Sequence, residues 1–258
     1  MNATMNGSTK TGGIIACWAA LVATIVCNGL FESLRLGGVT SAEVSNQVFA
    51  WFTPAGYVFS IWGVIYAALV AWMIAETMRA RKGSALSMRQ AALFLASCAL
   101  NVGWLAAFHF QQIALALVLL IVLWVDLGFL YVSLRDDGTR TRLNLAPFSI
   151  YFAWSTVAMI ANATHLATRL VSAPPIIDQV STIVLTGAVL AVAFLAVRNS
   201  RDYVFPLVIL WATVGVGVHV AAVDPVVSTA VFILSAIGAL ATYLPTVFSA
   251  TAPVMPSD

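Results

Sequence analysis

Apolar residues gather in eight long stretches, separated by short polar segments. The stretches cover residues 13–34, 54–77, 89–109, 112–134, 146–168, 179–197, 203–222 and 226–248. They are close to the roughly 20 residues that an α-helix needs to cross about 30 Å of hydrocarbon. The polar segments between them are too short for a folded domain outside the membrane. The pattern therefore predicts an all-α fold, a polytopic membrane helix bundle with about eight transmembrane helices.

Basic residues indicate how this bundle is oriented, because Lys and Arg in short loops stay preferentially on the cytoplasmic side. With the N-terminus inside, ten of the 12 basic residues lie inside and only Arg35 and Arg169 lie outside. The ten are Lys10, Arg79, Arg81, Lys82, Arg89, Arg135, Arg140, Arg142, Arg198 and Arg201. Both termini are therefore expected in the cytoplasm. Residues 13–34 are interpreted as a first span, since this apolar run is too long for a signal peptide. We expect a multi-pass protein of the inner cell membrane.

The composition supports a membrane-embedded chain and excludes several other classes. Of the 258 residues, 61% are hydrophobic and 9% are charged, against about 45–50% and about 25% in soluble domains. So few charges do not cover a water-facing surface of this size, which excludes soluble enzymes and disordered proteins. The net charge of +2 does not favour a polyanionic partner such as nucleic acid. The expected surroundings are the lipid bilayer.

Aromatic and polar residues recur at helical spacing inside three of the apolar stretches. The stripes are Phe59, Trp62 and Tyr66 in the second stretch, Asn101, Trp104 and Phe108 in the third, and Tyr151, Trp154, Asn162 and His165 in the fifth. An asparagine in hydrocarbon needs a partner, so Asn101 and Asn162 are expected to face the interior of the bundle. The pattern allows two interpretations: the stripes either line a pocket for a small molecule or pack against one another as a core. Trp51 and Trp72, nearer to helix ends, fit the aromatic belt at the membrane interface.

Three short motifs lie in order on the second, third and fifth stretches. They are residues 51–59 (WFTPAGYVF) followed by Trp62 and Tyr66, residues 100–104 (LNVGW), and residues 147–151 (PFSIY) followed by Asn162. Together they resemble motifs of the translocator protein / tryptophan-rich sensory protein family (TspO/MBR). The resemblance covers about residues 13–170, a five-helix core. The last three helices have no counterpart in the short members of that family and are interpreted as an extension.

Two tryptophans of the family pattern are tyrosines in this chain. Tyr57 stands where the family's P-P-G-W-V-F run has tryptophan, and Tyr151 stands at the tryptophan position of the fifth helix. The second proline of that run is Ala55, and one residue is missing between Phe59 and Trp62. In bacterial members the two tryptophans are tied to tetrapyrrole binding and light-dependent porphyrin breakdown. The tyrosines therefore put the breakdown chemistry in doubt.

The resemblance implies a ligand-binding membrane protein, a sensor or carrier for a hydrophobic, tetrapyrrole-like molecule held within the first five helices. It implies porphyrin or haem as a ligand, a homodimer, and two domains, with residues 1–170 as the core and residues 171–258 as a three-helix extension packed on the same bundle. It assigns no catalytic residue and no metal ligand. The candidate ligand-binding residues are Pro54, Gly56, Tyr57, Phe59, Trp62, Tyr66, Asn101, Trp104, Tyr151, Trp154 and Asn162.

Charged residues in the apolar stretches suggest an alternative function. Asp126 lies well inside the fourth stretch, and an intramembrane carboxylate is a candidate for proton coupling. The alternative is therefore a proton-coupled secondary transporter of a small solute that uses Asp126. A protonated Asp126 bonded to a neighbouring helix is the purely structural reading. Near the helix ends, Glu32 is expected to pair with Arg35, and Glu76 with Arg79.

The three histidines suggest a third class. His109, His165 and His219 fall at the predicted outer ends of the third, fifth and seventh helices. Three imidazoles at one membrane depth would bind zinc, as a metal-dependent membrane enzyme needs. No H-x-x-x-H or H-E-x-x-H spacing supports such a site, and no P-loop or G-x-G-x-x-G run supports a nucleotide site. An enzyme is therefore the least supported of the three classes.

Overall fold

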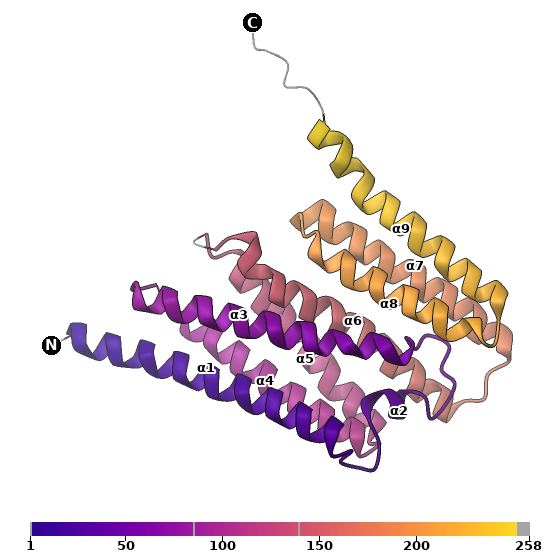
Figure 1. The fold of residues 1–258 in the computed structure, drawn as a ribbon, viewed down its shortest axis with the longest axis horizontal. Coiled ribbons are helices and arrows are strands. Elements are labelled where there is room, and N and C mark those ends of the chain that lie inside the picture. The colour runs from indigo at the N-terminus through magenta and orange to yellow at the C-terminus, as the bar shows by residue number, and fades with distance from the viewer. Residues whose placement is uncertain (1, 85, 139, 252–258) are drawn as a thin grey trace, which may run out of the picture. The chain divides into compact units, whose positions relative to one another are not determined.

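The computed structural model describes residues 2–84, 86–138 and 140–251, and all regular structure in these ranges is helical (Figure 1). Eight of the helices are long and apolar enough to cross a membrane. They are α1 (Asn2–Ser33), α3 (Ile61–Arg81), α4 (Met88–His109), α5 (Ile113–Arg135), α6 (Arg142–Leu170), α7 (Pro175–Ser200), α8 (Val204–Ala221) and α9 (Pro225–Thr251). The predicted all-α membrane bundle is thereby confirmed. A short helix α2 (Ser41–Ser45) and a 3-10 turn η1 (Gly56–Ser60) lie between α1 and α3.

Polar residues in the loops fix where several helices begin. At the start of α4, the Ser87 hydroxyl accepts a hydrogen bond from the Gln90 N–H, and the Gln90 side chain accepts one from the Ser87 N–H. The Asp202 carboxylate accepts bonds from two N–H groups at the start of α8, and Asp224 does the same for α9. These bonds satisfy N–H groups that a helix leaves unpaired at its first turn. The loops therefore set where each of these helices starts.

The chain divides into two compact units. The N-terminal unit contains the residues up to Ala50 and those from Gly56 to Ser172, and the C-terminal unit contains Trp51–Ala55 and the residues from Ala173 onward. A five-residue piece of the connection between α2 and η1 thus belongs to the C-terminal unit. The boundary after α6 lies close to the end of the core that the motifs suggest.

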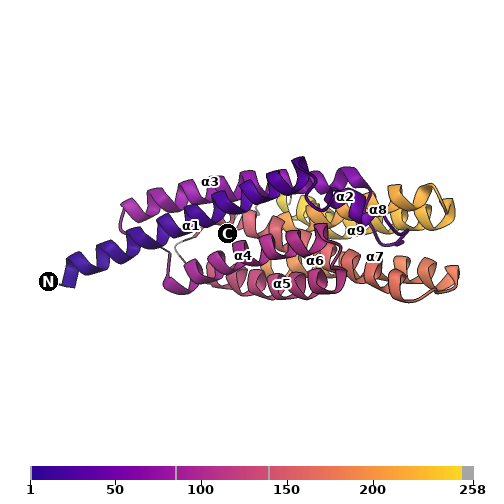
Figure 2. The ribbon, with the colours of Figure 1, turned by 90° about the horizontal axis from the view of Figure 1, so that it is seen from below.

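Five membrane helices of the N-terminal unit pack in a closed ring. Figures 1 and 2 show these helices from the side, in two directions. α1 packs against α3 and α4, α5 packs between α4 and α6, and α3 completes the ring by packing on α6. Large side chains that point into this ring, such as Leu21, Ile65 and Leu105, are fully buried. On the outer faces, by contrast, Ile15 and Val118 are exposed. A bundle surrounded by lipid has this pattern, because apolar side chains pack inside it and apolar side chains also face the lipid outside.

The C-terminal unit is a bundle of α7, α8 and α9, each of which packs on the other two. Buried hydroxyl groups bond between its helices: Ser235 donates to the Thr213 hydroxyl at 2.9 Å, and Ser228 donates to the Gly217 carbonyl at 2.8 Å. Such bonds hold helices together where no water is present. The segment Trp51–Ala55 joins this unit through the Ala55 N–H, which donates to the carbonyl of Gly215 in α8 at 3.0 Å.

Candidate functional site

The N-terminal unit encloses a group of aromatic rings centred on Trp62, here called the Trp62 cluster (Trp62, Tyr66, Trp104, Tyr151 and Trp154). The Trp62 ring centroid lies 5.4 Å from that of Trp104 and 5.7 Å from that of Tyr66, with Tyr151 at 5.9 Å and Trp154 at 6.3 Å. All five side chains are buried. They come from α3, α4 and α6, so the three sequence stripes meet inside the ring of helices. These distances are typical of interacting aromatic pairs.

A chain of hydrogen bonds crosses the same region. The Tyr66 hydroxyl donates to Oδ1 of Asn101 at 3.3 Å, and Nδ2 of Asn101 donates to the Tyr151 hydroxyl oxygen at 2.8 Å. The Asn101 carboxamide therefore links α3 to α6 from its place on α4. Because the Tyr151 oxygen accepts the Asn101 bond, its own O–H hydrogen is directed elsewhere and is available as a donor.

Several polar atoms on α3, α4 and α6 are buried without a partner among the described residues. The indole N–H groups of Trp62, Trp104 and Trp154 make no hydrogen bond within the described part of the chain, and neither do the two amide atoms of Asn162. An unpaired donor in a buried position costs about 1–3 kcal/mol. About 90% or more of the buried polar groups in native proteins have a hydrogen-bond partner, so this number of unpaired atoms on three packed helices is unusual. Donors that lie among aromatic faces suit a flat ligand that carries acceptor atoms.

The remaining candidate residues lie around this cluster or away from it. Phe59 extends the cluster, since its ring lies 5.8 Å from that of Trp154. Gly56 begins η1, and the Tyr57 side chain beside it is 45% exposed. Pro54 belongs to the C-terminal unit rather than to the unit that holds the rings. The sequence motif therefore contains residues with different surroundings.

The Asp126 side chain on α5 is buried. Burial is expected both for a carboxylate that couples to protons and for a purely structural one. The Oδ2 atom of Asp126 has no hydrogen-bond partner among the residues that the structure describes. Asp126 thus lies on a helix of the same ring that encloses the Trp62 cluster.

The three histidines lie in three different environments in the described structure. The fully buried His109 ring places Nδ1 3.0 Å from the Leu105 carbonyl and Nε2 3.6 Å from the Glu32 carboxylate. His165 is buried close to the backbone of Ser45, and His219 is part of the C-terminal unit. Within residues 2–84, 86–138 and 140–251 there is no group of three or more His, Cys, Asp or Glu side chains that would hold a metal ion.

The loop after α1 differs from the sequence expectation. Arg35 pairs with Glu43 at 2.6 Å, and Glu32 accepts a bond from the Ser41 N–H at 3.2 Å, so the expected Glu32–Arg35 pair is wrong. The cause is the backbone of Arg35, whose φ of +50° turns the chain away from the helix direction. The Thr40 N–H and the Arg35 guanidinium both bond to the Glu43 carboxylate and lower the pKa of Glu43.

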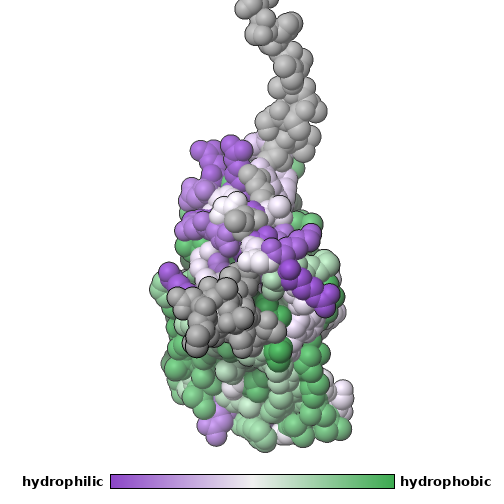
Figure 3. All heavy atoms as spheres, turned by 90° about the vertical axis from the view of Figure 1, so that its left-hand side faces the viewer, coloured by the Kyte–Doolittle hydropathy of each residue, from purple (hydrophilic) through white to green (hydrophobic). Residues whose placement is uncertain are grey.

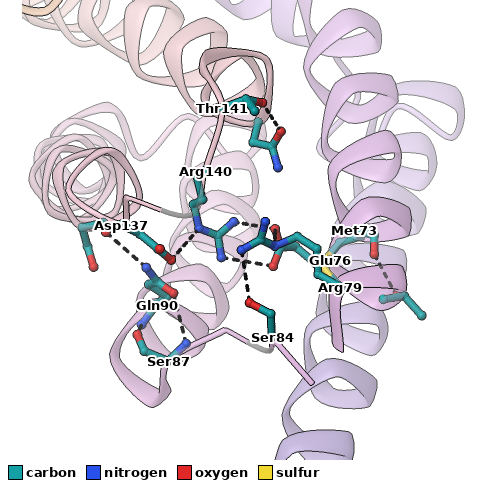
Figure 4. Close-up of polar contacts among 12 residues, drawn as sticks. Met73, Glu76, Arg79, Ser84, Ser87, Gln90, Asp137, Arg140 and Thr141 are labelled. Atoms are coloured by element: carbon teal, nitrogen blue, oxygen red, sulfur yellow. Dashed lines mark hydrogen bonds and ion pairs between the residues drawn. The ribbon is translucent and has the colours of Figure 1, made fainter. Parts of the chain in front are cut away.

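The opposite end of the N-terminal unit holds an ionic network that the sequence pattern reveals only in part (Figure 4). Glu76 lies 3.7 Å from Arg79, as expected, but its carboxylate is bound mainly by two nitrogens of Arg140. Arg140 also bonds to Asp137 at 3.0 Å. The side chains of Glu76 and Arg140 are 0% and 2% exposed. The only sequence signal for this pair is a glutamate within an apolar stretch.

Beneath this network, Trp72 is buried rather than placed in an interfacial belt, so that expectation is wrong. Its ring lies 4.7 Å from Phe148 and 5.1 Å from Phe94. Trp72 lies one helical turn before Glu76 on α3, on the face that points into the ring of helices. Phe94 lies on α4 and Phe148 on α6, so the neighbouring helices enclose Trp72, and sequence position alone does not show this.

The chain was compared with known proteins in three ways. The family model described as TSPO-like protein matches residues 14–244. A search of curated proteins and a search of solved structures each gave no match. The family match continues well beyond residue 170, where the sequence motifs end, and so includes α7, α8 and most of α9. Since the match spans most of a helical membrane bundle with the expected aromatic stripes, the chain belongs to the TSPO-like protein family.

Proposed function

We propose that this membrane protein binds a hydrophobic, tetrapyrrole-like molecule at the Trp62 cluster and acts as its sensor or carrier. The observation that supports this most strongly is the set of buried, unpartnered indole N–H groups of Trp62, Trp104 and Trp154. A porphyrin offers flat faces for stacking on the rings and carboxylate groups that accept hydrogen bonds from these donors. Family membership is consistent with such a ligand.

The proposed mode of binding follows from the ring contacts. The rings of the cluster touch one another, so a flat ligand enters only when at least one ring turns aside. The Asn101 bridge between α3 and α6 holds Tyr66 and Tyr151 in place during this change. No histidine takes part in the described ring contacts of the Trp62 cluster, so recognition is proposed to use the faces and edge of the porphyrin. Metal-free protoporphyrin IX should then bind about as tightly as haem.

The donors can be tested separately from the rings. Protein in nanodiscs is titrated with protoporphyrin IX and with its dimethyl ester, and binding is followed by the Soret absorption. A hydrogen bond to a charged group contributes about 1.5–3 kcal/mol, so the free acid should bind about tenfold or more tightly than the ester. Changing Trp62, Trp104 or Trp154 to Phe keeps a ring but removes the N–H.

At least one of these three variants should lose most of the preference for the free acid. Trp211→Phe in α8 is the matched control and should keep it, because Trp211 belongs to the other unit. Equal affinity of the wild-type protein for acid and ester would contradict the proposed role of the indole N–H groups.

Asp126 supports a second candidate function, proton-coupled transport of a small solute. The observation that favours it is a buried carboxyl oxygen for which the described residues supply no partner. Reconstituted vesicles under a pH gradient would then accumulate the solute, and Asp126→Asn would abolish accumulation while leaving equilibrium binding within about twofold. Uptake that persists in Asp126→Asn would remove this candidate.

The proposed location is the inner cell membrane, with both termini in the cytoplasm and the protein present as a homodimer. The distribution of the basic residues supports the orientation. Reporter fusions after residues 84 and 172 would test it, because the first loop is expected inside and the second outside. Mass photometry of the protein in nanodiscs would test the dimer.

A further inference from the structure

The acidic side chains near the α3–α4 turn and the α5–α6 loop all have basic partners. The pairs are Glu76–Arg140, Glu76–Arg79, Asp137–Arg140 and Asp136–Arg135. Figure 4 shows how closely the first three are interlinked. Each of these acidic side chains is therefore already paired, and none is left to neutralise other basic groups at this end of the N-terminal unit.

Three further basic residues at this end have no acidic partner among the described residues. Arg81 is the last residue of α3, Lys82 follows it, and Arg89 is the second residue of α4. All three are exposed and flank the turn between the two helices. The turn is tight because Gly83 adopts a φ of +88°. It therefore carries three uncompensated positive charges within a short piece of chain.

This turn must lie at the membrane surface, because it joins two helices that each cross the membrane. Met88, next to Arg89, is 87% exposed, although its side chain is apolar. An apolar side chain beside basic ones is suited to the boundary between headgroups and hydrocarbon, where long basic side chains reach up to the polar layer. Figure 3, viewed onto this end, shows hydrophilic residues gathered there, while the sides are largely hydrophobic.

We propose that the α3–α4 turn binds the headgroup of an anionic phospholipid through Arg81, Lys82 and Arg89. The guanidinium groups match the oxygens of a phosphate, and the Lys82 ammonium adds a further charge. Met88 inserts among the acyl chains and keeps the basic groups at headgroup depth. The proposal depends on the charge balance of this turn and is independent of what binds at the Trp62 cluster.

Native mass spectrometry after exchange into mixed lipid nanodiscs measures the selectivity. The wild-type protein should retain phosphatidylglycerol over phosphatidylcholine, and raised salt should weaken this preference. Each basic residue near an anionic surface contributes about fivefold, so the triple variant Arg81→Gln/Lys82→Gln/Arg89→Gln should lose on the order of 100-fold. A single Arg89→Gln change should lose about fivefold and keeps the test valid if the triple variant fails to fold.

The matched control keeps the three charges but has one guanidinium fewer: Arg81→Lys/Lys82→Arg/Arg89→Lys should retain most of the preference. Glycerol phosphate, added as a soluble headgroup, distinguishes a lipid from a free phosphate compound. It should compete poorly, because it lacks the acyl chains that Met88 contacts. Equal retention of both lipids by the wild-type protein, unchanged selectivity in the triple variant, or full competition by glycerol phosphate would each overturn the proposal.

Discussion

The buried pair between Glu76 and Arg140 makes a sharp prediction about stability. The carboxylate of Glu76 is 0% exposed and binds two nitrogens of Arg140. Arg140→Met removes the guanidinium but keeps much of its volume. Glu76 then keeps Arg79 as a basic partner among the described residues, with the Arg79 Nε 3.7 Å away. Removing one partner of a buried pair costs about 3–5 kcal/mol, and we expect the lower end because Arg79 remains.

Changing the other partner of the pair, Glu76, should lower the free energy of unfolding by less. In Glu76→Gln the guanidinium of Arg140 keeps the Asp137 carboxylate at 3.0 Å, and the carboxamide oxygen of the new side chain still accepts a bond. We expect a loss of about 1–2 kcal/mol. The double variant leaves no unpaired buried charge at this position, so its loss should be smaller than the sum of the single losses by about 2 kcal/mol.

Reversible unfolding in mixed micelles, driven by SDS and followed by circular dichroism, measures these free energies. Arg135→Gln is the control, because the Arg135–Asp136 pair is 40% and 63% exposed and an exposed pair contributes at most about 1 kcal/mol. The reasoning would be refuted if Arg140→Met lowered the free energy of unfolding no more than Arg135→Gln does. It would also be refuted if the losses of the two single variants simply added in the double variant.

Two predictions concern the loop between α1 and α3. A Cβ on Gly37 (φ +90°) would collide with the backbone carbonyl of His109, whereas one on Gly38 (φ +83°) meets nothing within 4 Å. Gly38→Ala should therefore cost about 1–2 kcal/mol from strain alone, and Gly37→Ala at least about 1 kcal/mol more; equal losses in SDS unfolding would contradict this. Because the Thr40 N–H and Arg35 lower the pKa of Glu43 below its ordinary 4.5, its contribution to stability is present above that value and is lost as the pH falls through the lowered pKa. A carbon-13 NMR titration of the Glu43 carboxyl should give this midpoint, and Arg35→Gln should raise it.

Much of the fold follows from the sequence because a membrane span has a simple pattern. A helix in hydrocarbon needs about 20 apolar residues, and all eight stretches become helices of that kind. The stripes that contain Trp62, Asn101 and Tyr151 meet because helical spacing places each on one face. Their approach inside the ring of helices was therefore predictable, although not the bonds that connect them.

The features that sequence reasoning missed depend on residues far apart in the chain. Arg140 reaches Glu76 from a loop, and no periodic pattern links a loop residue to a helix. In the same way, Ala55 bonds to Gly215, so the neighbouring Pro54 belongs to the C-terminal unit although its motif lies among the ligand-site residues. The tight turn at Arg35 redirected its side chain to Glu43. Tertiary contacts of this kind override what local spacing predicts.

The most direct test of the central claim is tryptophan-fluorescence quenching of the purified protein by protoporphyrin IX. Binding at the Trp62 cluster predicts saturable quenching at low micromolar ligand, since three of its rings are indoles. Trp62→Leu should weaken the affinity about tenfold, which corresponds to about 1.4 kcal/mol for the loss of a stacking ring at the centre of the cluster. Trp211→Leu should leave it unchanged. Quenching that does not saturate, or that is equally strong in Trp62→Leu, would show that the ligand does not bind at this cluster.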